Sequence, residues 1–137
     1  MAYWLLKTEP GTYSFDDLER EGETRWDGVH NPTALGHIRR MRPGDACVIY
    51  HSGDVRAAVG LATVTTEPYP DPEGGDPKLV VVDVRAGQRL NPPVPLAVLK
   101  ADPLFAASPL LRIPRLSVVP LTEAQYQAIV ARGHAPG

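Results

Sequence analysis

The sequence predicts a single α+β domain built around a barrel-like sheet, and three observations lead to this fold class. The 137 residues are enough for one domain with a core of its own. Hydrophobic residues make up 43% and charged residues 22%, as in ordinary globular chains. Fifteen prolines and twelve glycines cluster between short apolar runs, which is typical of many short strands joined by tight loops. We therefore expect one domain over residues 1–137 and a barrel-like sheet rather than a helical bundle.

Five segments carry the pattern of β-strands. Each is a short apolar run bounded by proline, glycine or small polar residues. The segments cover residues 3–7, 46–51, 57–65, 79–84 and 113–119. The polar turn at 52–54 predicts a hairpin between the second and third segments, and the β-branched run at 79–84 is typical of a strand buried on both faces. Residues 67–77 contain four prolines and two glycines and are expected to form a long loop.

Three segments are predicted to be helices, because each follows a good capping residue. Ser14, Asn31 and Thr122 precede the helices expected at 15–21, 32–41 and up to Arg132. The first and third have an acidic or amide residue three positions after the cap, which is the spacing of a capping box. Residues 92–95 are expected to be a connector, and residues 96–111 to hold short helical turns.

Charge and cysteine content narrow the function classes. The formal net charge is −2 and the isoelectric point about 6.1, whereas a protein that coats nucleic acid through its phosphates usually has a strong positive excess. A small site for one nucleotide stays open, because local charge can differ from net charge. Cys47 is the only cysteine, so an internal disulfide and a thiolate zinc cluster are excluded, and we expect it to be buried. We expect no membrane span or signal peptide, and a cytoplasmic location.

Catalytic motifs find little support. His51, Ser52 and Asp54 are neighbours, but the chain has no Gly-x-Ser-x-Gly elbow, and adjacent residues of a strand point to opposite faces. The four histidines match no zinc spacing, and there is no phosphate-binding glycine loop. We therefore expect no metal and no cofactor, and an enzyme is the least favoured class.

A binding pocket has better support around Trp26. This tryptophan is expected in a polar loop, Trp26-Asp27-Gly28-Val29, that leads into the helix capped by Asn31. Helix starts present unpaired N–H groups, and stacking of a base on an aromatic ring contributes about 1–3 kcal/mol. The next strand ends at Tyr50-His51-Ser52 and would bring these residues close by. The alternative interpretation is that Trp26 only plugs the barrel end and Asn31 only caps its helix.

The residues in these segments resemble a known family over almost the whole chain. The matching stretches are Tyr3-Trp4-Leu5-Leu6-Lys7-Thr8-Glu9-Pro10, Tyr13-Ser14, Asp17-Leu18, Trp26-Asp27-Gly28-Val29, Met41-Arg42-Pro43-Gly44-Asp45, Tyr50-His51-Ser52, Gly60-Leu61-Ala62, Tyr69-Pro70-Asp71-Pro72, Asp83-Val84, Leu99-Lys100-Ala101-Asp102-Pro103 and Arg115-Leu116-Ser117-Val118. This pattern resembles the EVE domain of the PUA-like superfamily, which is similar to YTH domains. The resemblance implies a five- to six-stranded β-barrel flanked by short helices. It also implies a non-catalytic reader that binds a modified nucleobase by extruding it, chiefly a modified cytosine in DNA, or modified RNA.

Carried over by position, the resemblance implies a set of ligand-binding residues. Trp26 would form one wall of the pocket, and the other members would be Val29, Asn31, Tyr50, His51, Ser52, Lys7 and Ser14. Candidate phosphate contacts are the cations near the expected mouth: Arg39, Arg40, Arg42, Arg112 and Arg115.

The chain also departs from the family pattern next to the pocket. Where the family usually has arginine, glutamine, a second arginine and asparagine, this chain has His30, Thr33, Leu35 and Gly36. Leu79 stands where the family commonly has tryptophan. Bidentate arginine contacts are not replaced by a mostly neutral histidine. Two other classes therefore stay open: a small-molecule or free-nucleotide binding protein, and a protein-interaction module that uses the 67–77 loop.

Overall fold

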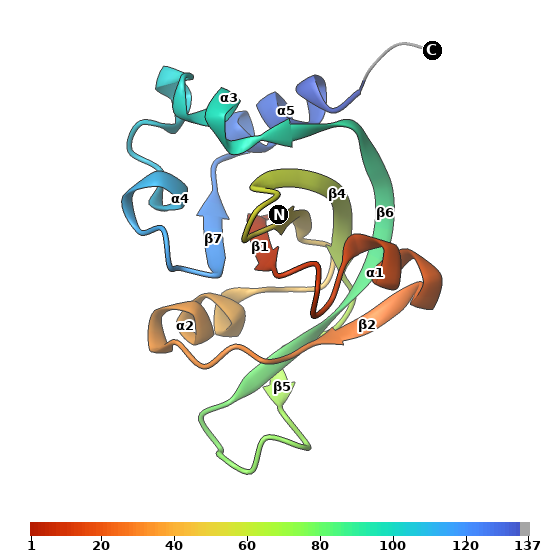
Figure 1. Ribbon diagram of the computed structural model, residues 1–137. Coiled ribbons are helices and arrows are strands. Elements are labelled where there is room, and N and C mark those ends of the chain that lie inside the picture. The colour runs from red at the N-terminus through yellow and green to blue at the C-terminus, as the bar shows by residue number, and fades with distance from the viewer. Residues whose placement is uncertain (135–137) are drawn as a thin grey trace.

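The computed structural model describes residues 1–134, which fold into one strongly curved β-sheet with short helices around it (Figure 1). In these residues the strands are β1 (Tyr3–Thr8), β2 (Glu23–Trp26), β3 (Ala46–His51), β4 (Ala57–Val64), β5 (Tyr69–Pro70), β6 (Val80–Pro95) and β7 (Val118–Leu121). The helices are α1 (Phe15–Glu21), α2 (Pro32–Arg40), α3 (Leu96–Lys100), α4 (Pro109–Arg112) and α5 (Glu123–Arg132), with a 3₁₀ turn η1 (Pro103–Phe105). The predicted α+β class is confirmed.

The sheet has the course of a barrel but does not close within residues 1–134. Its strands follow the order β2-β6-β4-β3-β1-β7, and the short β5 pairs with β6. The pair β1–β3 is parallel and the other pairs are antiparallel. β2 and β7 are the two edges, and no described ladder joins them. Helix α2 packs against both β6 and β7 and lies beside this gap (Figure 1).

The core lies inside this curved sheet, and α1 is fitted against it at a glycine. Apolar side chains of β1, β3, β4 and β6 make up most of the core, such as Leu5 and Ile49, which are fully buried. Phe15 of α1 is also fully buried. A Cβ at Gly60 of β4 would lie 2.3 Å from the Phe15 ring, so the absence of a side chain at this position allows α1 to sit on the sheet.

A buried carboxylate fastens the start of β1 to the end of α2. Asp45 is 4% exposed and accepts three hydrogen bonds of 3.0 Å each, from the backbone N–H groups of Ala2 and Arg42 and from the indole Nε1 of Trp4. The bond from the Trp4 indole is buried, and the two backbone bonds are partly buried. The Asp45 carboxylate therefore joins three segments of the chain and has a structural role.

Several expectations about the elements were wrong. The strand expected at 79–84 runs on to Pro95 as β6, and the loop expected at 67–77 contains the short strand β5. Trp26 does not lie in a loop but is the last residue of β2. The polar sequence of β2 has no strand pattern, and the strand forms by pairing with β6. Residues 92–95 are not a connector but the end of β6, because Val94 still pairs with Ala58 between the prolines. The closing strand begins at Val118 instead of Ile113, since Leu116 N–H turns back to the Ile113 carbonyl at 3.0 Å. The predicted helices agree with α1, α2 and α5 to within one residue.

Candidate functional site

A cavity of about 580 Å³ lies where the barrel stays open. Its walls come from the end of β1 and the loop after it, from β2 and the loop after it, and from the residue before β7. The lining residues are Lys7, Thr8, Glu9, Thr12, Tyr13, Thr24, Arg25, Trp26, Asp27, Gly28, Val29 and Ser117. Because the edges of β2 and β7 are not joined, the sheet leaves room here for a ligand. We call this space the Trp26 cavity.

Trp26 serves the core and the cavity together. Its side chain is only 7% exposed, and its backbone pairs opposite Val82 of β6. The Tyr13 ring meets the Trp26 ring edge to face, with centroids 6.1 Å apart and planes at 85°, a favoured aromatic geometry. The Tyr13 hydroxyl donates to the Glu21 carboxylate, and burial together with this bond raises the pKa of Tyr13 to about 12. Trp26 is therefore packed in the core, as the plug interpretation expects, and it also lines the cavity, as the wall interpretation expects.

Charged groups of both signs surround the aromatic pair. The Glu9 and Asp27 carboxylates and the Lys7 and Arg25 cations all line the cavity. Lys7 Nζ donates to the Pro114 carbonyl at 2.9 Å, and burial lowers the pKa of Lys7. Arg25 is held from the other side, because its Nη1 lies 3.3 Å from a Glu73 carboxylate oxygen. Its buried Nε has no hydrogen-bond partner, so one donor of this wall is unmet.

The predicted ligand-binding residues divide between this cavity and a second one. Lys7, Trp26 and Val29 line the Trp26 cavity. Tyr50 and Ser52 instead line a neighbouring cavity of about 360 Å³, which Lys7 also borders. The structure thus brings five of the predicted residues to two adjoining hollows, and Lys7 stands between them.

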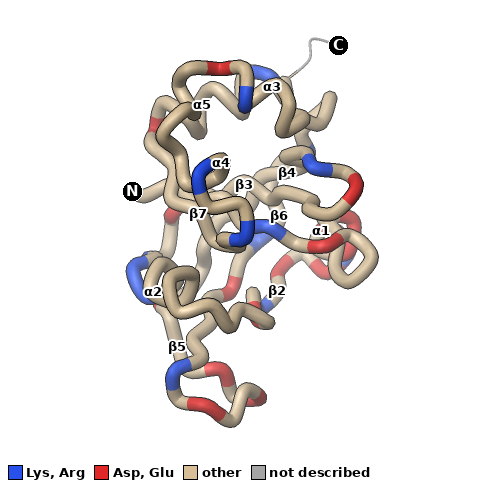
Figure 2. Tube along the Cα trace, turned by 60° about the vertical axis from the view of Figure 1, so that its left-hand side comes forward, with Lys and Arg blue, Asp and Glu red and all other residues tan. Residues whose placement is uncertain are grey.

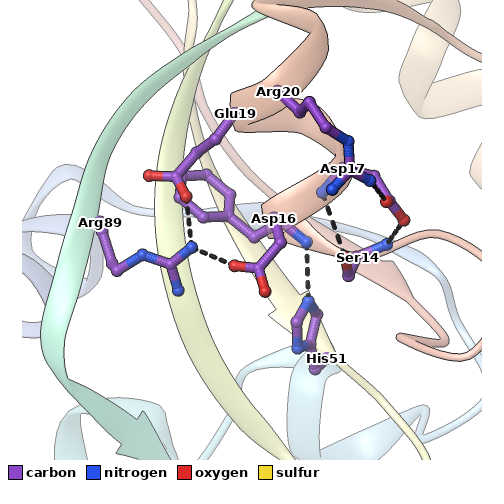
Figure 3. Close-up of polar contacts among 8 residues, drawn as sticks. Ser14, Asp16, Asp17, Glu19, Arg20, His51 and Arg89 are labelled. Atoms are coloured by element: carbon purple, nitrogen blue, oxygen red, sulfur yellow. Dashed lines mark hydrogen bonds and ion pairs between the residues drawn. The ribbon is translucent and has the colours of Figure 1, made fainter.

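Two further candidates hold the N-terminus of α1 and do not line the Trp26 cavity (Figure 3). Ser14 and Asp17 form a reciprocal capping box, with bonds of 3.1 and 2.9 Å. His51 Nε2 accepts the Phe15 N–H at 3.0 Å, and burial lowers the pKa of His51. Figure 3 also shows Arg89 of β6 bridging two carboxylates of α1, Asp16 and Glu19. This network fixes α1 and, through it, the Tyr13 segment that forms part of the cavity wall.

Asn31 caps α2 as the sequence predicted. Its Oδ1 accepts the Ala34 N–H at 3.0 Å, and it is exposed outside both cavities. The four positions that depart from the family pattern, His30, Thr33, Leu35 and Gly36, also lie outside the lining of the Trp26 cavity.

None of the predicted phosphate-contacting arginines lines the Trp26 cavity. Arg39 donates to the Lys78 carbonyl at 2.7 Å, and Arg40 lies over the Trp4 ring at 5.8 Å. Arg112 donates through Nε to the Ala106 carbonyl at 3.1 Å. Arg115 is exposed beside Pro114. Their contact with phosphate stays a prediction.

Other residue groups bear on chemistry less directly. In residues 1–134 no three His, Cys, Asp or Glu side chains are grouped to hold a metal ion, and His51 uses its Nε2 as a backbone cap. Cys47 is fully buried, and burial raises the pKa of its thiol strongly. No helix of the described part is both long and apolar enough to cross a membrane.

Sequence reasoning missed several lining residues. Glu9, Thr12, Tyr13, Thr24, Arg25 and Ser117 border the cavity, but only the pairing of β2 with β6 places Thr24 and Arg25 there. Glu9 and Tyr13 belong to the sequence stretches that resemble the family, near Lys7 and Ser14. Their closeness to these two residues along the chain was the one signal that could have indicated a place in the site.

Comparison with known proteins places the chain in a family. A family model, EVE domain, matches residues 2–132. Thymocyte nuclear protein 1 of Mus musculus is 30% identical, over 94% of this chain and 72% of the relative. Protein Atu2648 from Agrobacterium tumefaciens has a crystal structure with a TM-score of 0.93 and 35% identity, covering 97% of this chain and 93% of that one. Human THYN1 protein, solved in complex with 5-methylcytosine containing DNA, has a TM-score of 0.88 and 27% identity over the full length of both chains. The chain therefore belongs to the EVE domain family, with the PUA-like fold that its sequence indicated.

Proposed function

We propose that this protein is a non-catalytic reader of a modified cytosine in DNA, and that the Trp26 cavity receives the base after it leaves the helix stack. The observation that carries the proposal is the position of the Trp26 and Tyr13 rings in a cavity of about 580 Å³ at the open side of the barrel. Cavities of roughly 300–1,000 Å³ are the usual size of small-ligand sites. The human THYN1 protein with the same fold, solved with 5-methylcytosine containing DNA, supports the choice of base.

The lining chemistry suits a cytosine that carries an added methyl group. The aromatic pair and Val29 offer apolar surface to the ring and its methyl group. The Glu9 and Asp27 carboxylates are acceptors, and a carboxylate that accepts from the exocyclic amino group is the usual protein partner of cytosine. Thr24 and Ser117 add hydroxyl groups that donate to the carbonyl edge. An extruded base exposes this edge, which is paired inside a duplex.

A free-nucleotide binding protein is the second candidate, and one observation favours it. Arg39 and Arg40 contact a loop carbonyl and the Trp4 ring instead of facing the cavity mouth. Salt separates the two functions, because each phosphate contact with single-stranded nucleic acid contributes about −0.7 to the slope of log K against log salt, whereas a free base contributes almost none.

The test compares oligonucleotides that differ in one base. Fluorescence anisotropy would measure binding of otherwise identical DNA strands with 5-methylcytosine or cytosine at the central position. We expect tighter binding to the methylated strand. Glu9→Gln should weaken binding of both cytosine forms, since the neutral amide also presents N–H donors to the base amino group. Glu67→Gln removes an exposed carboxylate whose closest cation, Arg42, is 3.7 Å away, and it should leave binding unchanged.

Two outcomes would contradict the proposal. Equal, weak binding of both strands would exclude a reader of cytosine methylation. Selective binding that Glu9→Gln and Glu67→Gln leave untouched would move the reading site away from the Trp26 cavity.

A further inference from the structure

The lining of the second cavity includes three cations and no acidic residue, and the Glu9 carboxylate lies at its edge against Gly53. Its volume is about 360 Å³, and its walls are Lys7, Tyr50, Ser52, Gly53, Arg56, Leu96, Lys100, Leu110 and Pro114. Three of these side chains are positive and none is negative, in a protein whose formal net charge is −2. Positive charge is therefore concentrated locally around this hollow. We call it the cationic cavity.

The three cations have no ion-pair partner in residues 1–134. Every described salt bridge belongs to other side chains. Lys7 Nζ contacts the Pro114 carbonyl at 2.9 Å and lies 5.7 Å from the centre of the Tyr50 ring. Arg56 Nε contacts the Gly53 carbonyl at 3.1 Å, which holds the guanidinium beside the hollow. Like charges gathered around one space repel each other, and an anion in that space would relieve the repulsion.

The backbone supports this placement of Arg56. Its φ of 50° is in the left-handed region, where it is the one non-glycine residue of the described chain, and such a conformation costs on the order of 1 kcal/mol or more. The Arg56 carbonyl accepts the Leu96 N–H at 2.8 Å, which ties the hairpin after β3 to the start of α3. The strained residue therefore joins the two elements that supply the cavity wall.

Hydrogen-bond donors complete the lining. Tyr50 lies at the end of β3, Ser52 follows that strand directly, and both residues line the cavity. A tyrosine hydroxyl is protonated at neutral pH and can donate, and burial raises the pKa of Tyr50 further. Further positive charge lies next to the cavity, since Arg112 and Arg115 flank Pro114 in the chain. Figure 2 shows basic positions along α4 and the stretch that leads to β7, while the loop around β5 at the opposite end is mainly acidic.

A thin wall separates the cationic cavity from the Trp26 cavity. Lys7 lines both of them. Its backbone N–H donates to the Ser117 carbonyl at 2.9 Å, and Ser117 faces the Trp26 cavity whereas Pro114 faces the cationic one. Because the two cavities share Lys7, a nucleotide strand with a base on one side of this residue can reach the other side with its backbone.

We propose that the cationic cavity binds a phosphodiester group of the same strand whose modified base occupies the Trp26 cavity, with Lys7, Arg56 and Lys100 as the charged contacts and Ser52 and Tyr50 as neutral donors. The inference rests on the proposed function and adds to it the route of the strand. Base identity is read on one side of Lys7, and affinity independent of base comes from the other.

The test uses charge-removing variants on the two ends of the molecule. Arg56→Gln and Lys100→Gln each remove one cation from the cavity, and Lys78→Gln removes one from the exposed loop beside β5, far from α3 in Figures 1 and 2. Binding of single-stranded oligonucleotides with 5-methylcytosine or cytosine is measured between 50 and 200 mM salt. Each cavity variant should weaken binding to both strands roughly fivefold at 0.1 M salt, reduce the salt slope by about 0.7, and leave the ratio between the two strands unchanged. If both cavity variants behave like Lys78→Gln, the inference is overturned.

A second arm separates this inference from the proposed function. Inorganic pyrophosphate is titrated into the ¹⁵N-labelled protein, and amide shifts of Ser52, Gly53 and Lys100 are followed. Shifts that Arg56→Gln abolishes support an anion site, even if wild-type protein shows no preference for methylated DNA. Such shifts in a protein that binds no oligonucleotide would assign the cavity to free phosphates and overturn the strand route. No shift together with unaltered oligonucleotide binding in the variants would overturn the site itself.

Discussion

Trp26 offers a quantitative test, because its ring belongs to the core and to the cavity wall. Trp26→Ala should lower the free energy of unfolding by about 3–5 kcal/mol, the usual effect of emptying a buried aromatic site. The side chain is only 7% exposed and meets the Tyr13 ring edge to face. Its removal therefore leaves a cavity inside the protein that solvent does not readily fill. Small domains have total stabilities of about 5–15 kcal/mol, and the variant should therefore be folded but visibly weakened.

The same substitution should remove the stacking surface for a base. Stacking contributes about 1–3 kcal/mol, so affinity for a 5-methylcytosine oligonucleotide should fall roughly 5- to 150-fold. Binding is best measured near 15 °C, where domain stability is close to its maximum. Trp26→Phe keeps an aromatic face and should lose roughly 1–2 kcal/mol of stability, with a smaller loss of affinity.

Urea unfolding followed by circular dichroism, together with anisotropy on the folded variants, would check both effects. Trp4→Phe is the matched control, because Trp4 is 4% exposed but does not line the Trp26 cavity. It should reduce stability and leave base selectivity intact. If Trp26→Ala loses less than about 1 kcal/mol, the ring is not part of the core. If Trp26→Ala stays folded and binds as tightly as wild type, the ring is not a wall of the binding site.

Three further predictions concern stability and reactivity. Asp45→Ala should destabilise the protein by roughly 3 kcal/mol or more in urea unfolding, because three donors at 3.0 Å lose their acceptor; a loss below 1 kcal/mol would contradict this structural role. The free energy of unfolding should fall as pH drops below about 6.5, because the unfolded chain takes up a proton that the half-buried His51 of the folded protein resists. His51→Gln should flatten that profile in part, with a remainder from His37, whose pKa burial also lowers; an identical profile would exclude the His51 cap as a cause. The Cys47 thiol should react with Ellman's reagent only at the rate of opening or unfolding, because it is fully buried with a raised pKa; rapid labelling of the folded protein would show access that the structure lacks.

Local signals in the sequence were sufficient for much of the fold. Capping at Ser14, Asn31 and Thr122 is a matter of a few neighbouring residues, and all three cap their helices as expected. The apolar runs of β1, β3 and β4 were equally legible, because each carries its own hydrophobic content. β2 could not be predicted from its own sequence, because Glu-Thr-Arg-Trp becomes a strand only through pairing with β6. The open side of the barrel follows from that pairing and so was not predictable either.

The candidate site was predictable in its anchor but not in its division into two cavities. Lys7, Trp26 and Val29 were singled out and line the Trp26 cavity. Tyr50 and Ser52 were expected to face the same base, but they line the cationic cavity instead. β3 has a register irregularity between Ile49 and Tyr50, and alternation along the sequence does not report which way side chains point beyond such a shift.

The central claim is that a modified base enters the Trp26 cavity, and one NMR titration tests it most directly. A 5-methylcytosine oligonucleotide is added to ¹⁵N-labelled protein, and shifts of backbone and indole N–H groups are compared with those from the unmodified strand. The account predicts that the differences between the two strands concentrate at Thr24, Trp26 and Val29, on the wall of the cavity. Differences confined to residues outside this lining, with the Trp26 indole signal unmoved, would contradict it.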